Sequence, residues 1–135
     1  MRRAHVLLIL TTAALPACSS EGDDINQPSN RPPNSISIVD RAETRGTSAF
    51  NPNPLGVTLA SGGVVSWYND DEEPAGGDYG GSTGTIHNIL ADDLSFSSGN
   101  IVPGARFQQT FQQAGDHGYH CAIHPTMRGT ISVTP

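Results

Sequence analysis

The sequence contains no lysine, and all seven of its basic residues are arginines. Thirteen Asp and Glu residues give the chain a formal net charge of −6 at pH 7. Removing Arg2 and Arg3 with a leader would leave five basic residues against thirteen acidic ones, a net charge of −8. Binding to nucleic acid relies on Lys and Arg contacts to phosphate groups. We therefore expect no nucleic-acid partner.

Sulfur-containing residues are also scarce, because the chain has two cysteines and two methionines. With Met1 lost in a leader, Met127 is the only methionine left in the mature chain. An unpaired thiol is a liability in an oxidising compartment, so the presence of Cys121 needs an explanation. A disulfide to Cys18 is one alternative, but it would only attach a terminal segment to a strand end. We favour metal ligation by Cys121.

No segment has a sustained helical period, and there is no internal repeat. The apolar run Val6 to Leu15 follows the basic start Met1-Arg2-Arg3 and is shorter than the ~20 residues of a spanning helix, as in an export signal. We divide the chain into an export signal peptide (1–17), a disordered tether (18–34) and one domain (35–135).

The end of the apolar run, Leu15-Pro16-Ala17-Cys18, resembles a bacterial lipoprotein cleavage site, although Pro16 is unusual there. Two expectations stay open: lipidation of Cys18 as a membrane anchor, or ordinary cleavage nearby and a freely soluble exported protein. We expect an exported protein of the bacterial periplasm or cell envelope, and ordinary cleavage would also allow a secreted one. The following residues, Glu21 to Asn34, are rich in Asp, Asn, Pro and Ser without an apolar period, which is typical of disorder.

The domain has the pattern of an all-β protein, with short apolar runs separated by Gly, Pro, Asn and Asp. Alternation of side chains along a strand places Phe107 and Phe111 on one face and Tyr119 and Cys121 on another. We predict an antiparallel Greek-key β-sandwich of about seven or eight strands, with Trp67 in its core. The predicted strands are Ile36–Val39, Gly56–Leu59, Val64–Tyr68, Thr85–Leu90, Arg106–Phe111, Gly118–Cys121 and Thr130–Val133.

Metal-binding residue types recur at a regular spacing near the C-terminus, where Cys121, His124 and Met127 are three residues apart. His87, followed by Asn88, adds a second imidazole from an earlier predicted strand. A trigonal His₂Cys set with a weak, long Met is the ligand set of blue-copper centres. Zinc is the main competitor, but its structural sites use four strong ligands and rarely a thioether. Met127 therefore favours copper.

These segments resemble the cupredoxin family, the small blue copper proteins that include plastocyanin, pseudoazurin and amicyanin. The resemblance runs from about Phe50 to Val133 and rests on residues 50–69, on His87-Asn88 and on the segment 119–129. It implies one Cu(I)/Cu(II) ion with the ligands His87, Cys121, His124 and Met127. It also implies that Asn88 bonds across to the Cys loop, whereas the alternative for Asn88 is a cap of a local turn.

Two other groups of residues have open interpretations. The acidic run Asp70-Asp71-Glu72-Glu73 could attract a basic redox partner or could be a solvated loop, and the Gly-rich stretch that extends the insertion to residue 84 has no assigned role. His117 and His120 could form a weak secondary metal site, but strand alternation turns them away from the Cys121 face. We expect them to be ordinary exposed histidines. At His120, the resemblance also lacks the aromatic side chain that plastocyanin-like proteins have before the Cys.

The ligand set fits one copper ion and leaves no open coordination position, so we expect no enzymatic activity. The favoured function is the transfer of single electrons between redox partners, such as a cytochrome or a reductase, by a monomer. By resemblance, His124 would be the exit for electrons, flanked by the apolar Ile123 and Pro125. Two alternatives remain: a copper-binding or delivery protein of the cell envelope, and an accessory copper domain of a larger oxidase or reductase complex.

Overall fold

The computed structural model describes residues 30–72 and 84–135. These ranges hold eight strands and three short 3-10 helices, and none of their helices is long and apolar enough to cross a membrane. The strands are β1 (Ser35–Ile38), β2 (Phe50–Asn51), β3 (Leu55–Thr58), β4 (Val64–Asn69), β5 (Leu90–Ala91), β6 (Arg106–Thr110), β7 (Gly115–His120) and β8 (Arg128–Thr134). The 3-10 helices are η2 (Ala42–Thr44), η3 (Gly46–Ala49) and η4 (Leu59–Ser61).

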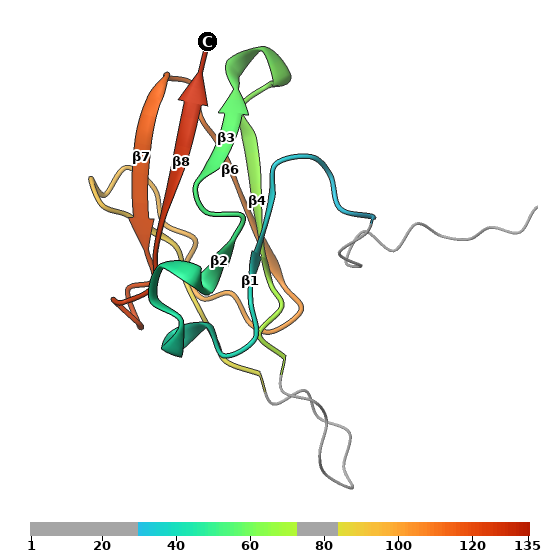
Figure 1. The fold of residues 1–135 in the computed structure, drawn as a ribbon, viewed down its shortest axis with the longest axis vertical. Coiled ribbons are helices and arrows are strands. Elements are labelled where there is room, and N and C mark those ends of the chain that lie inside the picture. Colours follow the sequence, from blue (N-terminus) through green and yellow to red (C-terminus); the bar gives the residue numbers. More distant parts are fainter. Residues whose placement is uncertain (1–29, 73–83) are drawn as a thin grey trace, which may run out of the picture.

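The strands form two four-stranded sheets that pack face to face as a sandwich (Figure 1). One sheet has the order β2-β1-β4-β6 and the other has the order β3-β8-β7-β5. This architecture confirms the predicted all-β sandwich and its number of strands. The loop between β7 and β8 lies at the end of the sandwich opposite the C-terminus, on the same end as η2 and η3 (Figure 1).

The pairing within the sheets is mixed, whereas we predicted antiparallel strands throughout. β1 pairs with β4 and β3 pairs with β8 in parallel, and the pairs β1–β2, β4–β6, β5–β7 and β7–β8 are antiparallel. Parallel neighbours cannot be joined by a tight hairpin and need a long connection. Such partners lie far apart in the sequence, so local strand patterns do not reveal their direction.

The core lies between the two sheets and is built around aromatic side chains. Trp67 of β4 is fully buried, and its ring centroid lies 5.4 Å from that of Tyr119 on β7. Phe107 packs on the same indole at 5.7 Å, while Phe111 is buried and its neighbours Arg106, Gln108 and Thr110 are exposed. The predicted core position of Trp67 and the predicted faces of Phe107, Phe111, Tyr119 and Cys121 are therefore confirmed.

Six of the seven predicted strands lie within a few residues of observed ones. The seventh contains His87, a candidate ligand. The predicted strand Thr85–Leu90 is wrong, because only Leu90 belongs to a strand and His87 makes an isolated bridge to Ile101. Burial alternates along this segment, with His87 and Ile89 buried and Ile86 exposed, which gives a strand-like pattern without a continuous ladder. The Gly-rich insertion falls mostly on residues 73–83, outside the described residues.

Close to the start of the described chain, Arg31 is attached to the first sheet. Its guanidinium makes two 2.6 Å contacts to the two carboxylate oxygens of Asp70 and lies 4.0 Å from the ring centroid of Tyr68. Such bidentate pairs are among the stronger charge-assisted interactions. We assigned Arg31 to the tether, and its contacts show that the chain already lies against the domain at this residue.

Candidate metal centre

The loop that joins β7 to β8 carries three of the four predicted ligands and is closed by its own backbone. The His124 N–H donates to the Cys121 carbonyl over 3.2 Å, and the Met127 N–H donates to the His124 carbonyl over 3.0 Å. The Cys121 N–H in turn donates to the Met127 carbonyl over 3.1 Å. The three-residue spacing is thus that of two successive turns, which brings the three side chains to one end of the sandwich.

His87 reaches the same end of the sandwich from a separate segment. Its N–H donates to the Ile101 carbonyl over 3.2 Å and its carbonyl accepts from the Ile101 N–H over 2.7 Å. The side-chain amide of the buried Asn69 at the end of β4 donates to the carbonyls of Thr85 and Ile101, both over 2.8 Å. Asn69 therefore attaches both segments of this bridge to the first sheet. These protein contacts position His87 without a bound metal.

Three donor atoms from these two segments converge on one point. His87 Nδ1 lies 3.3 Å from His124 Nδ1 and 4.0 Å from Cys121 Sγ, and the distance from His124 Nδ1 to Cys121 Sγ is 3.7 Å. With metal–nitrogen bonds of about 2.0–2.1 Å and a metal–sulfur bond of about 2.3 Å, a planar trigonal site separates the nitrogens by roughly 3.6 Å and places each roughly 3.8 Å from sulfur. The observed triangle fits a single ion of this kind.

Met127 completes the set at the base of the loop. Its side chain is fully buried, as are those of His87 and Cys121, whereas His124 is half-buried. A thioether is a weak, soft donor, and burial shields it from the water that would otherwise compete for the position. The two imidazoles and the thiolate lie within 4.8 Å of one another, and with the thioether of Met127 on the same loop they make up the donor set of a type 1 copper site.

The thiol of Cys121 is free and is prepared for metal binding. Burial opposes its ionisation, but hydrogen bonds from His87 and from the Asn88 N–H outweigh burial and lower the thiol pKa to about 6. For His87, burial lowers the pKa, and the contacts to Cys121 and Asp71 raise it more, so its net pKa is raised. A thiolate is the form that binds metals, and it dominates here at neutral pH. The alternative partner, Cys18, lies outside the described residues.

Asn88 connects the two ligand segments directly. Its side-chain oxygen accepts a hydrogen bond of 2.6 Å from the Ala122 N–H, and its own N–H donates to Cys121 Sγ over 3.5 Å. These contacts match the bonding across to the Cys loop that the resemblance implies. Hydrogen bonds to a ligating sulfur and to the ligand loop are a usual means of tuning a metal site.

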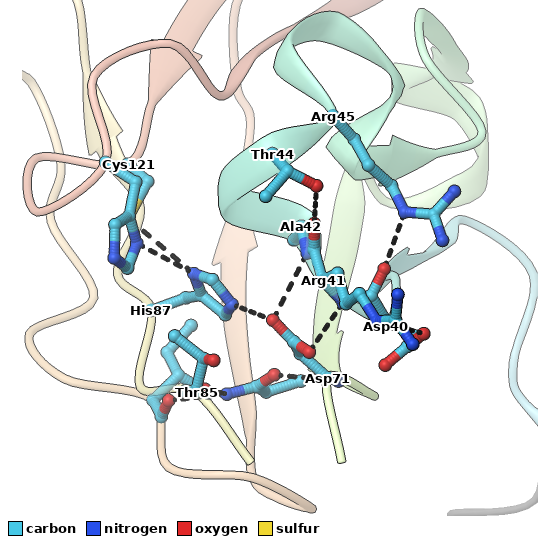
Figure 2. Close-up of polar contacts among 12 residues, drawn as sticks. Asp40, Arg41, Ala42, Thr44, Arg45, Asp71, Thr85, His87 and Cys121 are labelled. Carbon is cyan, nitrogen blue, oxygen red and sulfur yellow. Dashed lines mark hydrogen bonds and ion pairs between the residues drawn. The ribbon is translucent and has the colours of Figure 1, made fainter. Parts of the chain in front are cut away.

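Asp71 is a residue of the site that sequence reasoning missed. It lies on the side of His87 opposite Cys121, and its Oδ2 is 2.7 Å from His87 Nε2 (Figure 2). The side chain of Asp71 is 1% exposed and also accepts hydrogen bonds from the N–H groups of Arg41 and Ala42. Burial raises the carboxyl pKa, and the hydrogen bonds from His87, Arg41 and Ala42 lower it more, so the net pKa is lowered.

The acidic run is therefore not one solvated loop. Asp70 pairs with Arg31 and Asp71 is buried against His87, while Glu72 is exposed and Glu73 lies outside the described residues. No feature of the sequence distinguishes Asp71 from its three acidic neighbours. Its role depends on the turn that follows β4 and points the carboxylate inward.

A second group of metal-ligating residues shares His87 with the first. Side-chain donor atoms of Glu43, Asp71 and His87 lie within 4.8 Å of one another, and Glu43 Oε2 is buried without a hydrogen-bond partner in the described chain. The Asp71 carboxylate is already occupied by three N–H donors. We interpret this group as a hydrogen-bonded support behind His87, because a metal there would have to displace those donors.

The surroundings of the loop bear on two further expectations. Ile123 is 47% exposed and Pro125 is exposed, so apolar groups flank His124 at the surface. Neither His117 nor His120 belongs to a metal-binding group within the described residues. His120 instead contacts Asp92 at 2.5 Å, and His117 contacts the Gln113 carbonyl at 3.1 Å. Both lie on β7 and are half-buried, whereas we expect exposed side chains.

No protein-family model matches the chain, and no curated protein matches it either. Solved structures do match it. A purple cupredoxin from Nitrosopumilus maritimus is 25% identical, with a TM-score of 0.59 over 74% of this chain and 98% of that one. A reduced mutant amicyanin is 22% identical, with a TM-score of 0.51 over 76% of this chain and 85% of that one. The chain has the cupredoxin fold.

A larger enzyme also contains this fold. The copper-containing nitrite reductase from Thermus scotoductus is 23% identical, with a TM-score of 0.56. The match spans 77% of this chain but 23% of the reductase. The similarity is therefore to one domain-sized part of that enzyme.

Proposed function

We propose that this cupredoxin-fold chain binds one copper ion through His87, Cys121, His124 and Met127 and carries single electrons between protein partners. The observation that supports it best is the triangle of His87 Nδ1, Cys121 Sγ and His124 Nδ1, with sides of 3.3 to 4.0 Å. Copper bound there would supply a one-electron Cu(II)/Cu(I) couple. The protein's part is to hold the ligands in one geometry for both oxidation states.

Rigidity of the ligand residues supports electron transfer over metal delivery. His87, Cys121 and Met127 are fully buried, and the backbone hydrogen bonds described above fix both ligand segments. A protein that hands its metal to a partner needs ligands that can be exposed and replaced. Only His124 reaches the surface, and the exposed Ile123 and Pro125 beside it allow a partner to approach its ring without displacing charged groups.

The cellular setting and the partner belong to the same proposal. The export-signal pattern before Cys18 supports a location in the cell envelope, with or without a lipid anchor. The acidic composition, with a formal net charge of −6, favours a basic partner such as a cytochrome or reductase, at a rate that falls with salt. We expect the chain to act as a monomer and to have no enzymatic activity.

The titration of Cys121 in the metal-free protein gives a first prediction. We expect thiolate absorption in the ultraviolet to appear as the pH rises through about 6, compared with about 8.5 for an ordinary thiol. Since the folded pKa lies below the unfolded one, the Cys121 thiolate stabilises the folded state fully above about pH 8.5. That contribution disappears as the pH falls through about 6. A midpoint near 8.5 in the folded protein would contradict the hydrogen bonding described here.

The function is tested by mixing the reduced copper protein with an oxidised basic cytochrome in a stopped-flow instrument. We expect the cytochrome to be reduced with one electron per copper, reversibly, at a rate that falls as salt is added. The zinc-loaded chain is the matched control, because it has the same surface and no redox couple. No electron exchange together with rapid loss of copper to a chelator would instead support the delivery alternative.

An accessory role in a larger complex is the second candidate, and the domain-sized match to a nitrite reductase favours it. A free electron carrier and an accessory domain would use the same copper ligands, so only the identity of the partner distinguishes the two functions. If the chain copurifies with an oxidase or reductase at a fixed ratio, it serves that enzyme. If it exchanges electrons as a free monomer, the carrier proposal holds.

A further inference from the structure

The inference concerns Asp71 and rests on the copper site proposed above. The carboxylate of Asp71 and the imidazole of His87 are in contact over 2.7 Å, and their side chains are 1% and 0% exposed. An ionised carboxylate can only accept a hydrogen bond, so in the neutral imidazole that binds a metal the proton lies on His87 Nε2. That leaves the lone pair on Nδ1, the atom that faces Cys121 and His124. Asp71 thus selects the tautomer of His87 that can bind a metal in the triangle.

Asp71 is held in place as firmly as the ligand that it orients. Its Oδ1 accepts from the Arg41 N–H over 2.7 Å, and its Oδ2 accepts from the Ala42 N–H over 3.2 Å as well as from His87. The Asp71 N–H donates to the side-chain oxygen of Asn69 over 3.1 Å. The N–H groups at the start of η2 therefore hold the carboxylate against the imidazole, and Asn69 at the end of β4 holds the Asp71 backbone.

This arrangement has an electronic consequence as well as a geometric one. A carboxylate that accepts from the outer nitrogen of a ligating histidine makes that histidine a stronger donor. A fixed negative charge in a buried, poorly polarisable setting is also screened much less than one in water. Both effects favour the more highly charged ion, Cu(II), over Cu(I).

We propose that Asp71 is a positioning residue of the copper site, which holds His87 in the metal-binding tautomer and lowers the reduction potential of the bound copper. The residue acts through His87 and does not touch the ion. In this chain, the carboxylate that does so comes from an acidic run whose other described members, Asp70 and Glu72, do not bond to His87.

The test compares Asp71→Asn with Asp70→Asn in the full chain. Both substitutions remove one negative charge at neighbouring positions, but only Asp71 contacts His87, while Asp70 contacts Arg31. We expect Asp71→Asn to lower the affinity for Cu(II) relative to Cu(I) about tenfold, which is a rise in potential of about 59 mV for a one-electron couple. Asp70→Asn should give a clearly smaller rise. Equal rises, or no rise in either variant, would overturn the proposal.

A second measurement needs no variant and decides the matter even if Asp71→Asn does not fold. Nitrogen-15 NMR of the histidine rings should show the His87 proton on Nε2 in the Cu(I) protein, exchanging far more slowly than that of His117. Exchange of the Nε2 proton as fast as at His117 would refute the role of Asp71. An unmodified chain that gives no blue copper spectrum would refute the copper site itself, whereas a blue chain with equal potentials in both variants would refute only this inference.

Discussion

Cys121→Ser will abolish the intense blue colour of the copper protein and leave a pale protein that binds copper more weakly through His87 and His124. The colour of such a site comes from charge transfer between a thiolate sulfur and Cu(II), and serine provides neither the sulfur nor an anion at neutral pH. Cys121 Sγ lies 4.0 and 3.7 Å from the two imidazole Nδ1 atoms, so its loss removes one corner of the triangle. The measurement is the visible spectrum after one equivalent of Cu(II).

Cys18→Ser is the matched control for this change, because Cys18 is the only other cysteine of the chain. It should leave the spectrum unchanged. A blue Cys121→Ser protein, or a loss of colour in Cys18→Ser, would show that the thiolate ligand has been misassigned.

Trp67→Ala will lower the free energy of unfolding by about 3–5 kcal/mol, the range for large aromatic residues in a protein core. Trp67 is fully buried on β4, with the rings of Tyr119, Phe107 and Phe96 at 5.4, 5.7 and 6.3 Å. Tyr119 lies on β7, two residues before Cys121, so the lost packing affects the strand that leads into the ligand loop. Urea unfolding of the metal-free protein, followed by circular dichroism, measures the effect without a contribution from copper.

Val64→Ala on the same strand serves as the control for Trp67→Ala. Val64 is 39% exposed, so we expect its truncation to change stability by no more than about 0.5 kcal/mol. A loss below about 1 kcal/mol for Trp67→Ala would contradict the packing described here, because so small a loss is typical of a surface position.

Three of the four proposed ligand residues could be placed together from the sequence because their chemistry and spacing are local. Cys121, His124 and Met127 lie within seven residues, and two backbone turns bring them together. Asn88 could be inferred only through the family resemblance, since its partner, the Ala122 N–H, lies 34 residues away in the chain.

The parts that could not be predicted depend on contacts between distant segments. The direction of β1 against β4 and of β3 against β8 is set by packing and not by any pattern within a strand. The segment around His87 has the burial of a strand, but its backbone pairs only at a single bridge to Ile101. Asp71 could not be recognised because a buried carboxylate and a solvated one look alike in an acidic run.

Charge and geometry around His87 explain why the site can form before copper arrives. Asp71 and Asn69 bind the His87 segment to the first sheet, while the Cys121 loop belongs to the second. Packing of the two sheets therefore assembles the triangle, and we expect the metal-free protein to be folded. A site formed in this way has little freedom to change shape between Cu(II) and Cu(I), which is what rapid electron transfer requires.

The central claim, that Cys121, His87 and His124 bind one copper ion as a trigonal thiolate site, is tested most directly by one spectroscopic experiment. The purified protein receives one equivalent of Cu(II), and its visible absorption and EPR spectra are recorded. Our account predicts an intense absorption band from the thiolate and a narrow copper hyperfine splitting. A pale protein with the wide splitting of ordinary Cu(II) would contradict the account, because Cys121 would then not be a ligand.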